Sequence, residues 1–250
     1  MSTFDIAPTA GARPGIARRA PRCHRVRMNA VPLPKATRRG LADEAADLVR
    51  DALFDGRFPP GAPLREVELA AGLGVSRGSV REALARLREE GLVRGGWHRS
   101  ATVIEVTADD VREVYELRAA LDVLAATTAR RTATGPRLDR LDALVDALEA
   151  KAHGGADDAE LAAADLDFHD HVYDLAGNAR LTAAWHAIRS QIRLFHLHRV
   201  TGAADGYRAH VVDEHRRIAA LLRGDDETAL AEYVREHVDA ARRILLAATR

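Results

Sequence analysis

The chain of 250 residues is 47% hydrophobic and 4% aromatic, and its formal net charge is zero. This length suffices for two packed domains, and the predominance of Ala and Leu among the apolar residues favours helices over sheet. The one cysteine, Cys23, excludes a disulfide framework and is typical of a cytoplasmic protein. No run approaches the roughly 18 apolar residues of a membrane span, so no membrane partner is expected.

Residues 1–37 contain five prolines, scattered arginines and no hydrophobic periodicity. This composition predicts a disordered, arginine-rich extension, and no apolar segment follows the arginines as it would in a secretory signal. The folded part begins soon after Met28, so translation could start there or at Met1. The intact mass of the native protein distinguishes the two.

The pattern from about residue 40 to 55 predicts an amphipathic helix. Its expected inward face is formed by Leu41, Ala45, Leu48, Ala52 and Leu53. Gly56 ends this helix, and the sequence Pro-Pro-Gly-Ala-Pro at 59–63 predicts a stiff turn into the next element.

Residues 64–94 predict two short helices joined by a tight turn at 73–76. The expected apolar face of the first helix consists of Val67, Leu69, Ala70, Ala71 and Leu73. Ser76 occupies the N-cap position of the second helix, where its hydroxyl accepts a backbone N–H. Val80, Leu84 and Leu87 follow at i, i+4 and i+7 and are expected to point inward.

The first turn of this second helix presents polar side chains to solvent, namely Ser76, Arg77, Ser79 and Arg81. A helix-turn-helix of this kind suits the major groove of double-stranded DNA. Arginine binds O6 and N7 of guanine with two hydrogen bonds, and hydroxyls reach phosphates or base edges. The alternative is a short helical hairpin with ordinary surface arginines.

Residues 91–106 predict a β-hairpin around a basic turn that contains His98 and Arg99, which are expected to contact DNA. Residues 38–106 would then form a winged helix-turn-helix. Residues 40–106 carry nine Lys+Arg against eleven Asp+Glu, so bulk charge does not establish DNA binding. Residues 76–99, however, carry six arginines against three glutamates, and phosphate affinity comes from such local clusters.

The run LA..LGVSRG.VREAL.RL..EGLV, which begins at Leu69, resembles the N-terminal domain of GntR-family bacterial transcription regulators. The resemblance covers about residues 40–106. It departs from the family at Val67, where an arginine is frequent, at Gly78-Ser79, where Thr-Pro is common, and at Ser100, where the wing usually has glycine. The operator sequence is therefore not transferable.

From Thr107 onward the pattern predicts only long helices, so the fold class is mainly α, with an all-helical antiparallel bundle over 107–250. The expected helices are punctuated by glycines and lie at about 108–131, 136–152, 158–176, 179–200, 207–223 and 226–248. Thr107 and Asn178 are expected N-caps.

Histidine placement in this bundle suggests a metal site. Asp165 and His169 are four residues apart on one helix, so their side chains share a face. His215 lies nine residues before Gly224 and His237 thirteen after it, which can bring the two level across an antiparallel turn. Three imidazoles and a carboxylate suit Zn²⁺, Ni²⁺, Fe²⁺, Co²⁺ or Mn²⁺. The alternative is that these histidines are solvated or capping residues, as we expect for His196 near a helix end.

Residues 108–245 resemble the metal-binding ligand domain (FCD) of the FadR subgroup of GntR regulators. The segments EVYELRAALD, D..FH…Y.LAGN and the EH…H run from Glu214 to His237 carry the match. The resemblance implies that Asp165, His169, His215 and His237 are metal ligands and that a small carboxylate effector binds near them. It also places Arg118 in the effector site, with Arg193 as a second candidate. A salt bridge on the side of Glu116, or exposure to solvent, is the alternative for Arg118.

These features together predict a homodimeric, cytoplasmic, metabolite-responsive transcription regulator, a repressor as is commonest in the family, and not an enzyme. Two alternatives belong to other classes. A metal-dependent enzyme could act on a small organic acid if Asp165, His169 and a second histidine formed a facial triad. An effector-independent DNA architectural protein would bind DNA without regard to metabolites.

Overall fold

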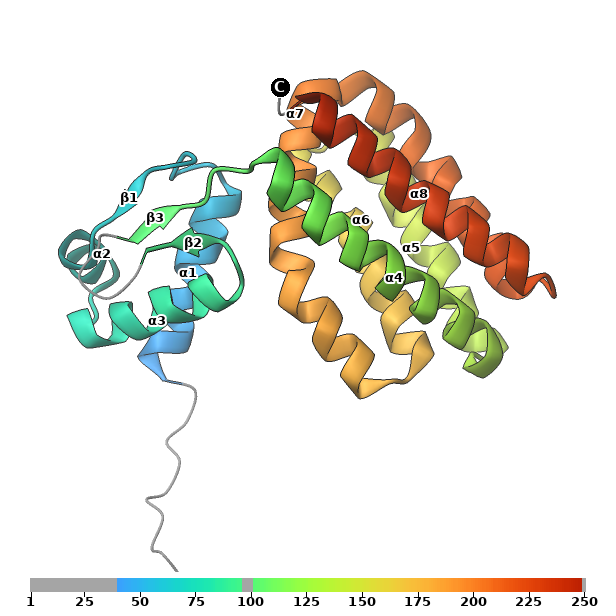
Figure 1. Ribbon diagram of the computed structural model, residues 1–250, viewed down its shortest axis with the longest axis horizontal. Coiled ribbons are helices and arrows are strands. Elements are labelled where there is room, and N and C mark those ends of the chain that lie inside the picture. Colours follow the sequence, from blue (N-terminus) through green and yellow to red (C-terminus); the bar gives the residue numbers. More distant parts are fainter. Residues whose placement is uncertain (1–39, 96–100, 249–250) are drawn as a thin grey trace, which may run out of the picture. The chain divides into compact units, whose positions relative to one another are not determined.

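The computed structural model describes residues 40–95 and 101–248, and of residues 198–207 and 209 it describes the backbone alone. Its N-terminal part contains α1 (Leu41–Phe54), β1 (Pro63–Leu64), α2 (Glu66–Leu73), α3 (Arg77–Glu89), β2 (Val93–Arg94) and β3 (Ala101–Val103). Five long helices follow, α4 (Ala108–Thr132), α5 (Gly135–His153), α6 (Asp158–Ala176), α7 (Ala179–Arg223) and α8 (Glu227–Ala248) (Figure 1). The predicted fold class, a winged helix-turn-helix followed by an all-helical bundle, is confirmed. The predicted extension 1–37 and the choice between Met1 and Met28 lie outside the described residues.

The buried face of α1 agrees with the prediction at Ala45, Ala52 and Leu53 and differs from it at the other two positions. Leu41 and Leu48 are 58% and 49% exposed, and the face turned inward includes Ala42, Ala46 and Val49 instead. Small residues decide this, because Ala45 and Ala46 pack against Ala83 of α3. Alanines let two helices approach closely, and the larger leucines therefore remain outside the contact.

The helix-turn-helix forms as predicted in its second helix, where Val80, Leu84 and Leu87 are all buried. Gly74 ends α2 with φ +67, a left-handed conformation that glycine adopts without strain. The expected apolar face of α2 is only partly correct, since Ala70 is buried but Val67 is 60% exposed and Ala71 is also exposed. An eight-residue helix offers too few positions for its period to define a face by itself.

The predicted hairpin is present and belongs to a three-stranded sheet of order β1-β3-β2. Val93 pairs with Val103 in the antiparallel hairpin, and Leu64 pairs with Ala101 on the other side of β3. The segment predicted only as a turn thus continues into a short strand, β1. His98 and Arg99, in the connection between β2 and β3, lie outside the described residues.

The bundle helices begin at side-chain caps. Thr107 accepts a hydrogen bond from the backbone N–H of Asp110, whose carboxylate accepts from that of Thr107 in return. Asn178 Oδ1 accepts from the backbone N–H groups of Arg180 and Leu181 at the start of α7. Both predicted caps are confirmed. Figure 1 shows α4 running alongside α8, and α4 also contacts α6 and α7.

Helix α7 is helical without interruption through Gly202, where a break was predicted. A single glycine costs a helix only about 1 kcal/mol relative to alanine, which neighbouring turns can offset. His196 and His215 both contact Asp165, which shows that the chain nevertheless changes direction between these two histidines. A straight helix would separate those two histidines by about 28 Å at ~1.5 Å per residue.

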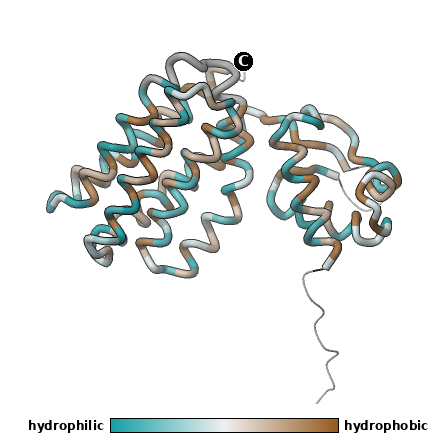
Figure 2. Tube along the Cα trace, turned by 180° about the vertical axis from the view of Figure 1, so that it is seen from behind, coloured by the Kyte–Doolittle hydropathy of each residue, from teal (hydrophilic) through white to brown (hydrophobic). Residues whose placement is uncertain are grey.

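Hydrophobic and hydrophilic residues alternate along the helices of the bundle in Figure 2, as expected for amphipathic helices that bury one face each. Among the helices that the structure describes, none combines the length and hydropathy needed to cross a lipid bilayer.

The Asn178→Ala substitution is expected to lower the free energy of unfolding by about 1 kcal/mol, because two backbone N–H groups at the start of α7 lose their acceptor. Urea denaturation measures this difference. The matched variant Asn178→Asp keeps an acceptor oxygen and should remain close to the native value. Equal stability of the alanine variant and the native protein would show that the cap contributes nothing.

Candidate metal centre and nucleic-acid interface

The start of α3 presents two serines and two arginines on the surface of the helix-turn-helix. Ser76 Oγ accepts from the backbone N–H of Ser79 at 3.1 Å and lies 3.0 Å from the Ser79 hydroxyl. The predicted N-cap is confirmed, and it places both hydroxyls at the first turn of α3. This turn is the part of a recognition helix that approaches base edges in the major groove.

Arg77 and Arg81 are directed to solvent, with side chains 64% and 67% exposed. Glu66 of α2 connects them, since it accepts two hydrogen bonds from Arg81, each 3.1 Å long, and lies 3.8 Å from Nη2 of Arg77. The hydrogen bond from Arg81 lowers the pKa of Glu66. Glu66 therefore holds the two guanidinium groups on one face of the helix-turn-helix.

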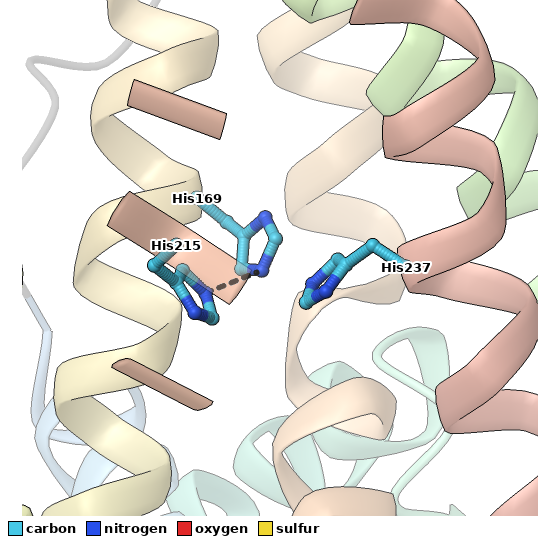
Figure 3. Close-up of side chains that lie close together, drawn as sticks. All are labelled: His169, His215 and His237. Atoms are coloured by element: carbon cyan, nitrogen blue, oxygen red, sulfur yellow. Dashed lines mark hydrogen bonds between the residues drawn. The ribbon is translucent and has the colours of Figure 1, made fainter. Parts of the chain in front are cut away.

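Three imidazoles from three helices converge inside the bundle. His169 of α6, His215 of α7 and His237 of α8 are buried, and one ring nitrogen of each lies within 4.8 Å of the others. Figure 3 shows the ring of His237 directed from α8 toward the rings of His169 and His215. The predicted levelling of His215 and His237 across the turn at Gly224 is confirmed by a distance of 5.2 Å between their ring centroids.

The outer nitrogens of two of these rings have acceptors, which defines their tautomers. Nδ1 of His215 is 2.6 Å from the carbonyl oxygen of Val211, and Nδ1 of His237 is 3.0 Å from Oε2 of Glu214. A carbonyl or carboxylate can only accept, so each Nδ1 carries a proton, and Nε2 is the nitrogen of each ring that could bind a metal. Outer partners of this type orient the histidines of metal sites.

Several lone pairs meet at one point beside His215. Its Nε2 lies 3.3 Å from Nε2 of His169, the contact drawn dashed in Figure 3, and 3.2 Å from Oδ1 of Asp165. Nε2 of His169 is itself the acceptor of an Arg118 hydrogen bond, so no donor proton lies between these atoms. Burial lowers the pKa of His215 to about 4, which keeps a second proton off this ring at neutral pH. Such a convergence of acceptors fits a cation.

Asp165 lies beside the histidine cluster rather than within the group of three. Its Oδ1 faces His215, while its Oδ2 is 2.9 Å from Nδ1 of His196. Burial opposes ionisation of Asp165, but attraction to His196 and His215 outweighs it, and its pKa lies well below the ordinary value. The carboxylate is therefore ionised and available to a cation.

His196 was assigned to a helix end, and this assignment is wrong. The residue is 1% exposed in the interior of the bundle, where it lies between Arg118 and Asp165. His169 and His186 lie at similar distances along the chain from the turn between α6 and α7, so His186 would be expected level with His169. His186 is nevertheless exposed.

Asp122 and Tyr173 complete the site and were not predicted. Asp122 accepts from Nε of Arg118 at 3.1 Å and from the Tyr173 hydroxyl at 2.5 Å. Burial, and then the charge of Asp122, raises the pKa of Tyr173. Asp122 follows Arg118 at i+4 on the same helix, a spacing from which this pair could have been found.

The two candidate effector arginines lie in different surroundings. Arg118 is 1% exposed and contacts Asp122, His169 and His196 at the centre of the site, so the alternatives of solvent and of Glu116 are excluded. Arg193 instead places its guanidinium over the ring of Phe54, 4.2 Å from the centroid. This contact gives Arg193 a packing role, so Arg118 is the candidate that contacts the histidines.

The free energy of unfolding of chelator-treated protein is expected to fall by about 2 kcal/mol between pH 7.5 and pH 5 through His215 alone. The unfolded chain binds this proton with an ordinary pKa of about 6.5, whereas the folded chain binds it only at about 4. Between these values the unfolded state binds more protons, so stability is lost as the pH falls. Urea denaturation across this range measures the effect. His215→Gln should remove it, and an identical pH dependence in both proteins would contradict the assignment.

Comparisons with known proteins identify both the helix-turn-helix and the helical bundle. Residues 41–104 match the family of bacterial regulatory proteins described as gntR, and residues 113–240 match the FCD domain. A D-xylose utilization operon transcriptional repressor of Paenarthrobacter nicotinovorans is 32% identical over 83% of this chain and 89% of its own length. An HTH-type transcriptional regulator of Bacillus subtilis is 28% identical over 76% and 84%. A transcriptional regulator from Rhodococcus has the same fold, with a TM-score of 0.71 and 27% identity over 84% of this chain and 99% of its own.

Proposed function

The chain belongs to the gntR family of bacterial regulatory proteins, and on that premise we propose that a metal-dependent sensor in its bundle controls DNA binding by its helix-turn-helix. Membership makes the chain a DNA-binding transcriptional regulator with an FCD domain, and not an enzyme. The metal, the effector and the residues that hold them are our proposal.

One observation carries the sensor half of the proposal, namely the convergence of acceptor atoms around His215. Nε2 of His215 is buried and lies 3.3 Å from Nε2 of His169 and 3.2 Å from Oδ1 of Asp165, with no proton between these atoms. Lone pairs at such distances repel unless a cation attracts all of them. With His237 as a third imidazole, the donor set suits Zn²⁺, Ni²⁺, Fe²⁺, Co²⁺ or Mn²⁺.

A bound divalent ion would supply a positive centre to which a carboxylate can attach. The protein's own residues supply the rest of the site. Val211 and Glu214 orient the rings of His215 and His237 through their Nδ1 protons. Arg118 offers a second positive charge for the anion, and Asp122 fixes that guanidinium through its Nε. We infer that the effector is a small organic acid recognised by the ion and Arg118 together.

The DNA half rests on Arg77, Arg81 and the serines of the first turn of α3. Two copies of the chain would bind the two halves of a near-palindromic operator, which matches protein two-fold symmetry. The effector would then shift the relative placement of the two DNA-binding units and release the operator, as in a repressor. To lower the population of the state that can bind the operator from 99% to 1%, the effector must bind the other state more favourably by about 5.5 kcal/mol.

A thermal-shift screen of organic acids, with metal content measured on the same sample, tests this proposal. We expect about one divalent ion per chain, and one acid that both raises the melting temperature and weakens operator binding in a gel-shift assay. Operator binding that no acid alters would favour a DNA architectural protein without an effector. A purified protein that retains no divalent ion, even after incubation with excess metal, would contradict the sensor.

A further inference from the structure

The guanidinium group of Arg118 donates a hydrogen bond to the nitrogen of His169 that a metal ion would need. Nη2 of Arg118 donates to Nε2 of His169 at 2.9 Å, and Nη1 donates to Nε2 of His196 at 3.1 Å. A guanidinium has only donors, so both imidazole nitrogens must accept with their lone pairs. The hydrogen bond from Nε of Arg118 to Asp122 anchors the group in this position.

Nε2 of His169 is also the nitrogen that faces the histidine cluster, 3.3 Å from Nε2 of His215. An imidazole nitrogen has one lone pair, which can accept a proton donor or coordinate a metal but cannot do both. Arg118 and a metal ion therefore compete for the same atom. Full coordination by His169 requires that Arg118 release it.

The guanidinium of Arg118 is enclosed by the protein, with only 1% of the residue exposed. Three of its five N–H groups donate to Asp122, His169 and His196. The small cavity beside Asp122 and His169 is not lined by Arg118, so it gives an anion no access to this group. An oxyanion can therefore bind the guanidinium only if the group moves from its present contacts.

We propose that Arg118 makes metal binding and oxyanion binding mutually dependent in this domain. An oxyanion takes the N–H donors of Arg118 and thereby frees Nε2 of His169 for the metal. The inference rests on the proposed function, and its own consequence is that removal of Arg118 should tighten metal binding when no oxyanion is present. By linkage, the factor by which the anion tightens metal binding equals the factor by which the metal tightens anion binding.

The test measures Zn²⁺ affinity by competition with a chromophoric chelator, with sodium acetate or with sodium chloride of equal ionic strength. In the native protein, acetate at about 100 mM should tighten Zn²⁺ binding about tenfold or more, the value of a hydrogen bond from a charged donor. The double variant Arg118→Met/Asp122→Asn removes one positive and one negative charge, so the net charge of the site is unchanged. The asparagine still offers an acceptor to Tyr173.

This double variant should bind Zn²⁺ about tenfold more tightly than the native protein in chloride, and acetate should change its affinity much less than it changes that of the native protein. A merely structural role for Arg118 would instead weaken or leave unchanged the binding of the ion. The matched control is Arg112→Met/Asp109→Asn, an exposed ion pair on the same helix, which should behave like the native protein. Circular dichroism of each variant verifies the helical content.

Native Zn²⁺ affinity that is the same in acetate and chloride would overturn the coupling while leaving the metal site itself intact. Weaker Zn²⁺ binding by the folded double variant would also overturn it. If neither protein binds Zn²⁺ at all, the metal site and the coupling both fail, which separates that outcome from the first two.

Discussion

The His215→Ala variant is expected to bind Zn²⁺ roughly a hundredfold to a thousandfold more weakly than the native protein. Apparent free energies of structural zinc sites are about 10–16 kcal/mol over four ligands, so each ligand accounts for about 2.5–4 kcal/mol. His215 is at the centre of the cluster, since its Nε2 contacts both His169 and Asp165. Isothermal titration or chelator competition measures the loss.

The same variant should also lose the stabilisation that the ion confers. Zn²⁺ at about a hundred times its Kd raises the free energy of unfolding by about 2.7 kcal/mol, and this increment should disappear in His215→Ala. The matched control is His186→Ala, because His186 is an exposed histidine on the same helix. Equal loss in both variants, or undiminished Zn²⁺ affinity in His215→Ala, would remove His215 from the site.

Replacement of both arginines, Arg77→Ala/Arg81→Ala, is expected to reduce the free energy of operator binding by about 2–6 kcal/mol. Each arginine that contacts a guanine contributes about 1–3 kcal/mol at one base position. Both side chains are exposed at the start of α3 and are held side by side by Glu66, so neither is needed for the core. Fluorescence anisotropy with an operator selected by the native protein measures the change.

The selectivity of the double arginine variant distinguishes base contacts from phosphate contacts. Loss of base contacts should relax the preference for the selected operator over random DNA, whereas loss of phosphate contacts weakens both and reduces the salt slope by about one per contact. Arg88→Ala, an exposed arginine near the other end of α3, is the control. Native affinity and native selectivity in the double variant would show that α3 does not contact the operator.

Periodicity and capping residues predicted most of the helices, because these signals are local. Ser76, Thr107 and Asn178 each accept the backbone N–H groups that their positions predict. Which face of α1 is buried could not be predicted in the same way. It depends on the close approach of Ala45 and Ala46 to Ala83, and that contact joins residues about forty positions apart.

The site shows the same limit. Two features of the sequence led to the cluster of histidines that the structure contains. One is the i, i+4 spacing of Asp165 and His169, and the other is the placement of His215 and His237 on either side of the turn at Gly224. The position of His196 beside Asp165 and Arg118 was not predicted, because α7 was expected to end near residue 200, which placed this histidine at a helix end and not inside the bundle. The hydrogen bond from Arg118 to His169 likewise could not be predicted, because it depends on how α4 and α6 pack against each other.

X-ray absorption at the zinc edge, on protein stripped with chelator and reloaded with one equivalent of Zn²⁺, tests the sensor most directly. In the presence of acetate, we expect a shell of three imidazole nitrogens at about 2.0–2.1 Å with oxygen as the remaining neighbour. The His237→Ala variant should show one imidazole fewer. A shell made of oxygens alone, or an imidazole count that stays at three in that variant, would contradict a metal ion held by His169, His215 and His237.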